Sequence, residues 1–323
     1  MKLVKPSPIK KFVGLSFPFH VCNLKCSYCY IGNHNGSLND IKWSDEEIRR
    51  AFSRKRIGVS FINICSDGET LIHERMPKIV KMMLEEGHYV MILTNGILAK
   101  RIEECLSFDK ELLRRLFFKI SFHYEELYSK NLLEVEFDNI RKIKESPCSL
   151  TVEYITTDMT LEQIEELKSL CISKLGVLPQ INMPRDERKH NLGVVSKLSW
   201  KNYVNKWNNN ISSEFFKFRQ QFFGRRYKEF CYTGMRQLWV DMETGNSRQC
   251  YHTPVIQNFM TCKKIICPAV GYTCPEAHCY VAHSHMTLGI VPYPMNTEYK
   301  TTYDVIRNRI CSDGYRYLSH IFE

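Results

Sequence analysis

The sequence predicts an α/β protein: a partial (β/α)6 barrel of parallel strands, followed by a small cysteine-rich C-terminal domain. Between residues 12 and 185, short β-rich runs alternate with amphipathic helical patterns, which favours parallel strands joined by helices. Beyond residue 196 this alternation stops. Six of the fourteen cysteines then fall between Cys231 and Cys279.

The barrel is expected to have six strands, each a short run rich in β-branched and aromatic residues. Six strand–helix units are too few for a complete eight-stranded TIM barrel and suit an open, TIM-like one. The expected strands cover residues 12–17, 58–65, 89–94, 117–122, 149–156 and 177–183.

Helical patterns fill the segments between these strands. Ser44 and Glu47 have the spacing of a capping box, in which each side chain caps the other residue's backbone N–H. Thr160 is a second cap candidate. Apolar residues at helical spacing predict helices over residues 73–86, 132–144 and 161–174.

The C-terminal part begins with two amphipathic helical patterns, at residues 197–209 and 214–230. Residues 238–250 are expected to form a hairpin that turns at Gly245. Residues 303–322 are expected to form a closing helix. The chain therefore divides into a core (1–196), a helical connector (197–230) and a cysteine-rich domain (231–323), which should pack as one body.

Composition indicates an ordinary soluble protein, with 44% hydrophobic and 25% charged residues. No apolar run is long enough to cross a bilayer, and the N-terminus has no export signal. Fourteen cysteines in such a chain favour metal ligation in a reducing compartment over disulfides. We therefore expect a cytoplasmic protein.

The charge balance is basic, with 45 Lys and Arg against 35 Asp and Glu, or +10. The basic pairs are scattered, which is typical of solvated surfaces. Where some gather, they would attract an anionic substrate or an acidic electron donor. No nucleic-acid recognition module is present, so nucleic acid is not an expected partner.

The run Cys22, Cys26 and Cys29 carries the strongest chemical signal. Cysteine thiolates at short spacing hold iron–sulfur clusters, and three of them leave one iron of a cubane open to a small molecule. The alternatives are a zinc site and a chance cluster of reduced thiols. Zinc would need a fourth ligand nearby, for which His20 and His34 are candidates.

Further polar residues fall at the ends of the expected strands. The C-terminal ends of parallel barrel strands converge on one face, where active sites form. A set of such residues behind a cluster motif therefore predicts a shared site. They are Ser66, Asp67, Gly68, Glu69, Thr70, Asn95, Ser121, His123, Glu153 and Arg185.

With these residues in place, the chain resembles the radical S-adenosylmethionine (SAM) superfamily, whose C-x3-C-x2-C signature follows the first strand of a partial barrel. The resemblance implies that Cys22, Cys26 and Cys29 hold a [4Fe–4S] cluster whose open iron binds SAM. Reductive cleavage of SAM would then release a 5′-deoxyadenosyl radical that abstracts a substrate hydrogen.

The same resemblance implies a set of cofactor contacts. Tyr28 matches the aromatic residue before the last motif cysteine. The family's Gly-Gly-Glu-Pro segment corresponds to residues 66–70, with neither the first glycine nor the proline kept, and His123 replaces the usual Asp of the fourth strand end. The implied contacts are Tyr28, Ser66, Asp67, Gly68, Glu69, Asn95, Ser121, Glu153 and Arg185.

The later cysteines resemble SPASM and Twitch domains, which hold auxiliary iron–sulfur clusters. Cys231-x13-Gly245-x4-Cys250 matches their opening element, whereas the following spacings are longer than usual. A single auxiliary [4Fe–4S] cluster is therefore expected on Cys231, Cys250, Cys274 and Cys279. Cys267 and Cys262 are the substitutes.

Cys65 and Asp241 are the catalytic candidates, as hydrogen-atom donor and general base. The structural alternatives are a core residue for Cys65 and a turn-flanking residue for Asp241. Because the barrel begins near the N-terminus, we expect dehydrogenation or epimerisation of a carbohydrate-like or other small substrate. The basic charge favours an anionic one, and the expected electron donor is flavodoxin- or ferredoxin-like. Maturation of a ribosomally made peptide is the alternative. A non-catalytic iron–sulfur or zinc protein is the alternative of another class.

Overall fold

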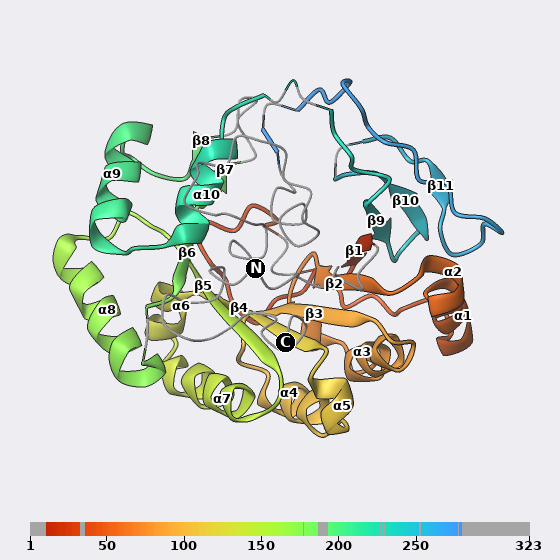
Figure 1. The fold of residues 1–323 in the computed structure, drawn as a ribbon. Coiled ribbons are helices and arrows are strands. Elements are labelled where there is room, and N and C mark those ends of the chain that lie inside the picture. Colours follow the sequence, from red (N-terminus) through yellow and green to blue (C-terminus); the bar gives the residue numbers. More distant parts are fainter. Residues whose placement is uncertain are drawn as a thin grey trace, which may run out of the picture.

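The computed structural model describes residues 11–32, 36–176, 178–186, 193–226, 228, 230–251, 253–276 and 278–279. In this part of the chain a curved sheet forms an open barrel with helices along its outer side (Figure 1). No helix of the described residues is long and apolar enough to cross a membrane. The expected closing helix at 303–322 lies outside the described residues.

The sheet has nine strands in the order β11-β10-β9-β1-β2-β3-β4-β5-β6. Strands β1 to β6 pair in parallel, as the alternating pattern predicts. All six expected barrel strands are present, and the last is shorter than expected. Their bounds are Lys11–Phe17, Ser60–Ser66, Tyr89–Thr94, Leu116–Phe122, Ser149–Ile155 and Gln180–Asn182.

The expected helices are α1, α3, α7, α8, α9 and α10. Both capping boxes are present, Ser44 with Glu47 and Thr160 with Gln163. Helix α10 ends at Phe222, shorter than predicted, and Gly224 follows with φ of 63°. The bounds are Asp45–Ala51, Met76–Glu85, Leu133–Glu145, Leu161–Leu175, Trp200–Asn210 and Glu214–Phe222.

Four further helices and a 3-10 turn were not expected from the sequence. Each helix has eight residues or fewer, which is too short for a periodic apolar pattern to stand out. They are α2 (Arg54–Ile57), α4 (Ala99–Leu106), α5 (Lys110–Leu113) and α6 (Tyr124–Ser129), with η1 at Thr70–Ile72.

The predicted hairpin exists, and it extends the barrel sheet. β9 (Gln237–Asp241) and β10 (Asn246–Arg248) are antiparallel, and β11 (Gln257–Asn258) pairs with β10. β9 also pairs in parallel with β1, so that Gly14 lies beside Trp239. A Cβ at position 14 would lie 1.9 Å from the Trp239 ring, which explains a glycine inside this strand.

Buried hydrophobic side chains pack on both faces of the sheet, against the outer helices and inside the barrel. β2 is buried along almost its whole length, as is typical of a parallel strand covered on both faces. On the barrel side, the Phe12 and Phe61 rings stack with centroids 5.5 Å apart, and the Phe61 and Phe117 rings are tilted with centroids 5.4 Å apart. Burying each of these rings stabilises the fold by about 1.5–3 kcal/mol.

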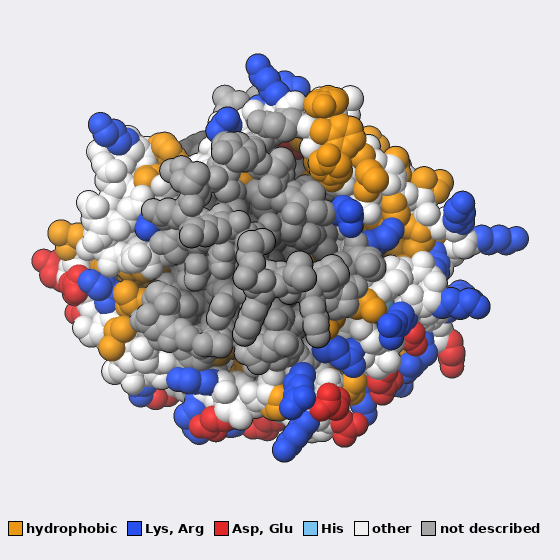
Figure 2. All heavy atoms as spheres, viewed as in Figure 1, with side chains coloured by type: hydrophobic (Ala, Val, Ile, Leu, Met, Phe, Trp, Pro, Cys, Tyr) orange, Lys and Arg blue, Asp and Glu red, His pale blue; other side chains and the backbone are white. Residues whose placement is uncertain are grey.

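On the surface, basic side chains are dispersed. In the view of Figure 2 the Lys and Arg side chains lie at separate places around the margin of the described surface. This face therefore carries no single basic patch among the described residues, consistent with solvated basic pairs.

Candidate active site

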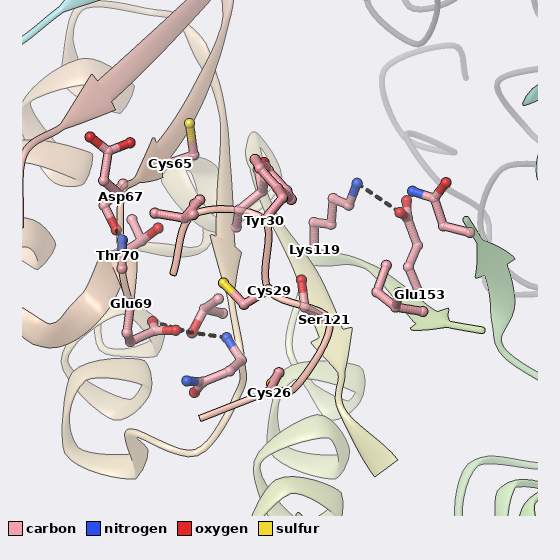
Figure 3. Close-up of a pocket in the computed structure, with 18 of the residues that line it drawn as sticks. Cys26, Cys29, Tyr30, Cys65, Asp67, Glu69, Thr70, Lys119, Ser121 and Glu153 are labelled. Carbon is pink, nitrogen blue, oxygen red and sulfur yellow. Dashed lines mark hydrogen bonds and ion pairs between the residues drawn. The ribbon is translucent and has the colours of Figure 1, made fainter. Parts of the chain in front are cut away.

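A cavity of about 490 Å³ opens at the C-terminal ends of the barrel strands (Figure 3). The position is the one that a parallel barrel predicts for its active site. All three motif cysteines, every residue implied as a cofactor contact, and Cys65 line it. These residues are Cys22, Cys26, Tyr28, Cys29, Cys65, Ser66, Asp67, Gly68, Glu69, Asn95, Ser121, Glu153 and Arg185.

The motif cysteines lie in the loop that leaves β1. The Cys29 N–H donates to the Cys26 carbonyl at 3.1 Å, and the Leu24 N–H donates to Cys22 Sγ at 3.5 Å. Burial raises the pKa of Cys22, and raises that of Cys26 to about 12, with Cys22 and Cys29 adding to the latter effect. Cys22 and Cys26 therefore hold their protons while no metal is bound, with Cys29 as a close neighbour.

This set of three thiols fits a [4Fe–4S] cluster, which cysteine thiolates hold. The zinc-ligand candidate His34 lies outside the described residues. Buried thiols lose their protons when a metal takes the proton's place. No three Cys, His, Asp or Glu side chains of the described residues are arranged to hold one metal ion. In a cubane each thiolate binds a different iron, so the sulfurs need not converge on one point.

His123, which stands where the family usually has Asp, contacts the cysteine loop. Its Nδ1 lies 2.7 Å from the Tyr28 hydroxyl, and burial lowers the pKa of the imidazole to about 4. Tyr28 in turn hydrogen-bonds the Cys26 thiol. His123 therefore keeps a polar contact at this strand end, through Tyr28.

Glu69 ties the loop after β2 to the end of β3. Its buried carboxylate accepts hydrogen bonds from Thr94 Oγ1 at 2.6 Å, the Asn95 N–H at 2.8 Å and the Leu71 N–H at 2.9 Å. Asn95 Nδ2 then donates to Asn23 Oδ1 at 2.6 Å, inside the cysteine loop. Burial raises the pKa of Glu69, and these hydrogen bonds oppose that rise.

The segment from Ser66 to Thr70 packs directly against the cysteine loop. The Glu69 N–H donates to the Val21 carbonyl at 2.8 Å, and a Cβ on Gly68 would lie 2.1 Å from that oxygen. The one glycine kept from the family segment is therefore required by this close approach. Asp67 lies nearer the rim, with Ser16 Oγ 3.5 Å from its carboxylate.

On the opposite wall, Lys119 Nζ lies 2.7 Å from the buried carboxylate of Glu153. Figure 3 shows this pair on one side of Cys26 and Cys29, with Asp67, Glu69 and Thr70 on the other. Arg185 lies over the Tyr30 ring, 4.7 Å from its centroid. The cavity thus has a carboxylate-bearing wall and a wall richer in cations.

Sequence reasoning missed several residues of the cavity. Lys119 could have been found, because it lies two positions before Ser121 and so faces the same side of β4. Arg219, Trp239 and Tyr251 carry no comparable signal, because α10 and the hairpin reach the cavity only through tertiary packing. The Trp239 and Tyr251 rings lie 4.1 Å apart.

The later cysteines fall into two sets. The thiols of Cys279, Cys231 and Cys274 lie close enough to Cys250 to add to the burial that raises its pKa. By contrast, Cys262 Sγ lies 3.1 Å from an Arg56 nitrogen, and Cys267 Sγ lies 2.9 Å from Lys11 Nζ. The other three expected auxiliary ligands thus lie within electrostatic reach of Cys250, whereas the two substitutes contact basic side chains.

The two catalytic candidates have different surroundings. Cys65 lines the cavity, donates to the Leu15 carbonyl at 3.3 Å, and has a pKa raised by burial to about 12. Asp241 is not among the residues that line the cavity. Its carboxylate accepts the Glu243 N–H at 2.8 Å and the Thr244 hydroxyl at 2.8 Å, which is a turn-stabilising role.

Comparison with known proteins identifies the core of this fold. Residues 16–171 match the family model of the Radical SAM superfamily. The chain is similar to the structure of Streptococcus suis SuiB bound to S-adenosylmethionine, with TM-score 0.51 and 14% identity over 79% of this chain and 65% of that one. It is also similar to SuiB bound to precursor peptide SuiA (TM-score 0.50, 16% identity, 80% and 64% coverage).

A third solved structure, native anSMEcpe with bound AdoMet and Cp18Cys peptide, matches with TM-score 0.50 and 17% identity over 78% of both chains. No curated protein matches the chain. At these identities the similarity shows the fold alone, and the chain spans about two thirds of the SuiB length.

Proposed function

Starting from a radical SAM domain over residues 16–171, we propose that this protein is an enzyme that cleaves SAM reductively to initiate radical chemistry on a substrate. The observation that carries the proposal is one cavity lined by Cys22, Cys26, Cys29 and the Glu69-anchored loop. When bound, a [4Fe–4S] cluster with SAM would supply a 5′-deoxyadenosyl radical that abstracts a substrate hydrogen.

The chain's own residues orient and enclose the reactants. Gly68 and Glu69 hold the segment from Ser66 to Thr70 against the cysteine loop, which offers its backbone to the amino group of SAM. Tyr28 and His123 hold the part of the cysteine loop around Cys26, and Asn95 holds the part around Cys22. Ser121, Glu153 and Arg185 remain proposed contacts of the cofactor, with Asp67 nearer the rim.

For the substrate we propose a small, carbohydrate-like molecule that is dehydrogenated or epimerised. Cavities for small ligands span about 300–1,000 Å³. The 490 Å³ cavity lies within that range. Cys65, at the cavity wall, is the proposed hydrogen-atom donor for an epimerisation.

Modification of a ribosomally made peptide is the second candidate. It is favoured by the fold likeness to two proteins whose structures contain peptides, SuiB and anSMEcpe. Incubating the reduced protein with SAM and either a carbohydrate or a precursor peptide, while following 5′-deoxyadenosine, separates the two. Formation stimulated only by peptide would overturn the carbohydrate proposal.

An auxiliary [4Fe–4S] cluster on Cys231, Cys250, Cys274 and Cys279 completes the proposal, within a C-terminal domain spanning 231–323 after a connector at 197–230. Its support is the proximity of these four thiols. Two cubanes predict about eight iron atoms per chain. A cytoplasmic location and an acidic electron donor are part of the same proposal.

The decisive control removes the first cluster. A Cys22→Ala, Cys26→Ala, Cys29→Ala variant should lose SAM cleavage entirely after anaerobic reconstitution. Cleavage retained by this variant would refute the site assignment. A wild-type protein that binds iron or zinc without cleaving SAM would instead establish the non-catalytic alternative.

A further inference from the structure

The inner end of the cavity contains an asparagine that the proposed SAM site does not use. Asn63 lies in the middle of β2, is only 2% exposed and lines the cavity. The proposed SAM contacts on β2 and β3 begin at Ser66 and Asn95, where those strands end. Strands rise about 3.3 Å per residue, so Asn63 lies about 10 Å deeper in the barrel than Ser66.

The side-chain amide of Asn63 has an unmet hydrogen bond. Its Oδ1 is buried and has no hydrogen-bond partner among the described residues. By contrast, the buried amide of Asn139 on α7 donates from Nδ2 to the Gly96 carbonyl at 2.8 Å. A buried polar atom without a partner is costly, and a ligand that supplies the missing hydrogen bond offsets that cost. The Asn63 amide therefore points to a ligand at the inner end of the cavity.

The residues around this amide are apolar. Gly14 on β1 and Met91 on β3 pair with Asn63 in the sheet register. The Trp239 ring lies over Gly14, and both Trp239 and Met91 line the cavity. Sites for small ligands combine an apolar lining with a few polar groups that fix the orientation of the ligand. Asn63 is placed to be such a group.

Cys65, the proposed hydrogen-atom donor, lies next to Asn63 along the same wall. Alternate residues of a strand face the same side, and both residues line the cavity. Two residues of a strand span about 7 Å between their Cα atoms. A substrate group held by Asn63 therefore lies close to the Cys65 thiol.

We propose that Asn63 binds a hydroxyl group of the substrate at the inner end of the cavity, beside Cys65. A hydroxyl suits this amide because it donates to Oδ1 and can also accept from Nδ2. The inference rests on the proposed function, and it narrows the substrate class to a small molecule with a free hydroxyl at its buried end, such as a sugar or another polyol.

The test measures binding to the full-length, anaerobically reconstituted protein with SAM present. Calorimetric titrations use glucose, myo-inositol, tetrahydropyran and a serine-containing peptide as probes. Tetrahydropyran has the ring of a sugar without its hydroxyls, so it lacks the group that Asn63 binds. Wild-type protein should bind glucose or myo-inositol about fivefold or more tightly than tetrahydropyran.

Asn63→Leu keeps the approximate shape of the side chain and removes its hydrogen bonds. It should weaken binding of that polyol about 5- to 100-fold, the range for a lost hydrogen bond at a buried site. Binding of tetrahydropyran and of SAM should not weaken. Asn205→Leu, the same change at an exposed position of α9, is the matched control and should bind as wild type does.

A second measurement separates ligand binding from a structural role. Without a polyol, Asn63→Leu should raise the urea midpoint of unfolding, because it removes a buried polar atom that lacks a partner among the described residues. Asn139→Leu, which takes the donor away from the Gly96 carbonyl, should lower that midpoint. Uncoupled 5′-deoxyadenosine formation checks that Asn63→Leu still cleaves SAM.

Four binding results would overturn the proposal: no preference of the wild-type protein for either polyol over tetrahydropyran, unchanged polyol affinity in Asn63→Leu, an equal loss of SAM affinity in that variant, or Asn63-dependent binding of the peptide alone. A loss of stability in Asn63→Leu as large as that in Asn139→Leu would assign Asn63 a structural role and overturn it too. All of these leave SAM cleavage by the wild-type protein standing. Absence of that cleavage would instead overturn the proposed function itself.

Discussion

Replacing Glu69 by Gln tests whether this carboxylate holds the cofactor loop together. The change preserves the side chain's shape but replaces one of its two accepting oxygens by an NH2 group. Oε2 accepts the Asn95 N–H, and Oε1 accepts the Thr94 hydroxyl and the Leu71 N–H, so at least one buried donor loses its acceptor in either orientation of the amide. A buried donor left without an acceptor costs about 1–3 kcal/mol. We therefore expect Glu69→Gln to lower the free energy of unfolding by about that amount and to weaken SAM binding.

Glu136 provides a matched control on α7. It is also fully buried, burial raises its pKa well above the ordinary value, and neither carboxylate oxygen has a hydrogen-bond partner among the described residues. A buried polar group without a partner costs about 1–3 kcal/mol. Glu136→Met should therefore stabilise the protein at pH 7 by a similar amount.

The assay is anaerobic urea unfolding of both variants, followed by circular dichroism, with SAM affinity measured by titration. Two buried glutamates should then change stability in opposite directions. A Glu69→Gln variant within about 0.5 kcal/mol of wild type, the range of ordinary surface substitutions, would refute the reasoning. So would a Glu136→Met variant that loses as much stability as Glu69→Gln.

Three further predictions address the auxiliary site, the hairpin and pH. Cys274→Ala should remove about four iron atoms per chain and retain some SAM cleavage. The control Cys262→Ala, which changes the cysteine that contacts Arg56, should keep all iron. Equal iron loss in both variants would contradict the ligand assignment. Gly14→Ala should destabilise the fold by about 1–3 kcal/mol through its clash with Trp239, visible as altered tryptophan fluorescence. Burial lowers the pKa of His88, so its contribution to stability is present above about pH 6.5 and is lost as pH falls through the folded-state pKa. His88→Gln should therefore reduce the slope of unfolding free energy against pH on the acid side by up to about 1.4 kcal/mol per pH unit. An unchanged slope would contradict this.

Local patterns in the sequence predicted most of the barrel. The strand run at 89–94 matches β3, and the capping residues Ser44 and Thr160 lie where α1 and α8 begin. These features depend on side chains within a turn or strand of one another, so neighbouring residues encode them. Short helices such as α2 and α5 were missed because four residues carry no period.

The candidate site, too, was predicted in part from local patterns and decided in part by tertiary structure. Every residue expected to hold SAM or the SAM-binding cluster lines one cavity, because the C-terminal ends of parallel strands converge whatever the details of packing. Asp241 lies in the predicted hairpin, and only the structure shows its carboxylate engaged by Thr244 in the turn.

The sequence by itself determined the cysteine motif, the strand–helix alternation and the polar residue at each strand end, since these are periodic or closely spaced features. Only the tertiary structure decided that β9 pairs with β1, that Cys231, Cys274 and Cys279 lie within electrostatic reach of Cys250, and that Arg219 reaches the cavity. Such contacts join residues far apart in the chain. They depend on the complementarity of two packed surfaces, which no local pattern records.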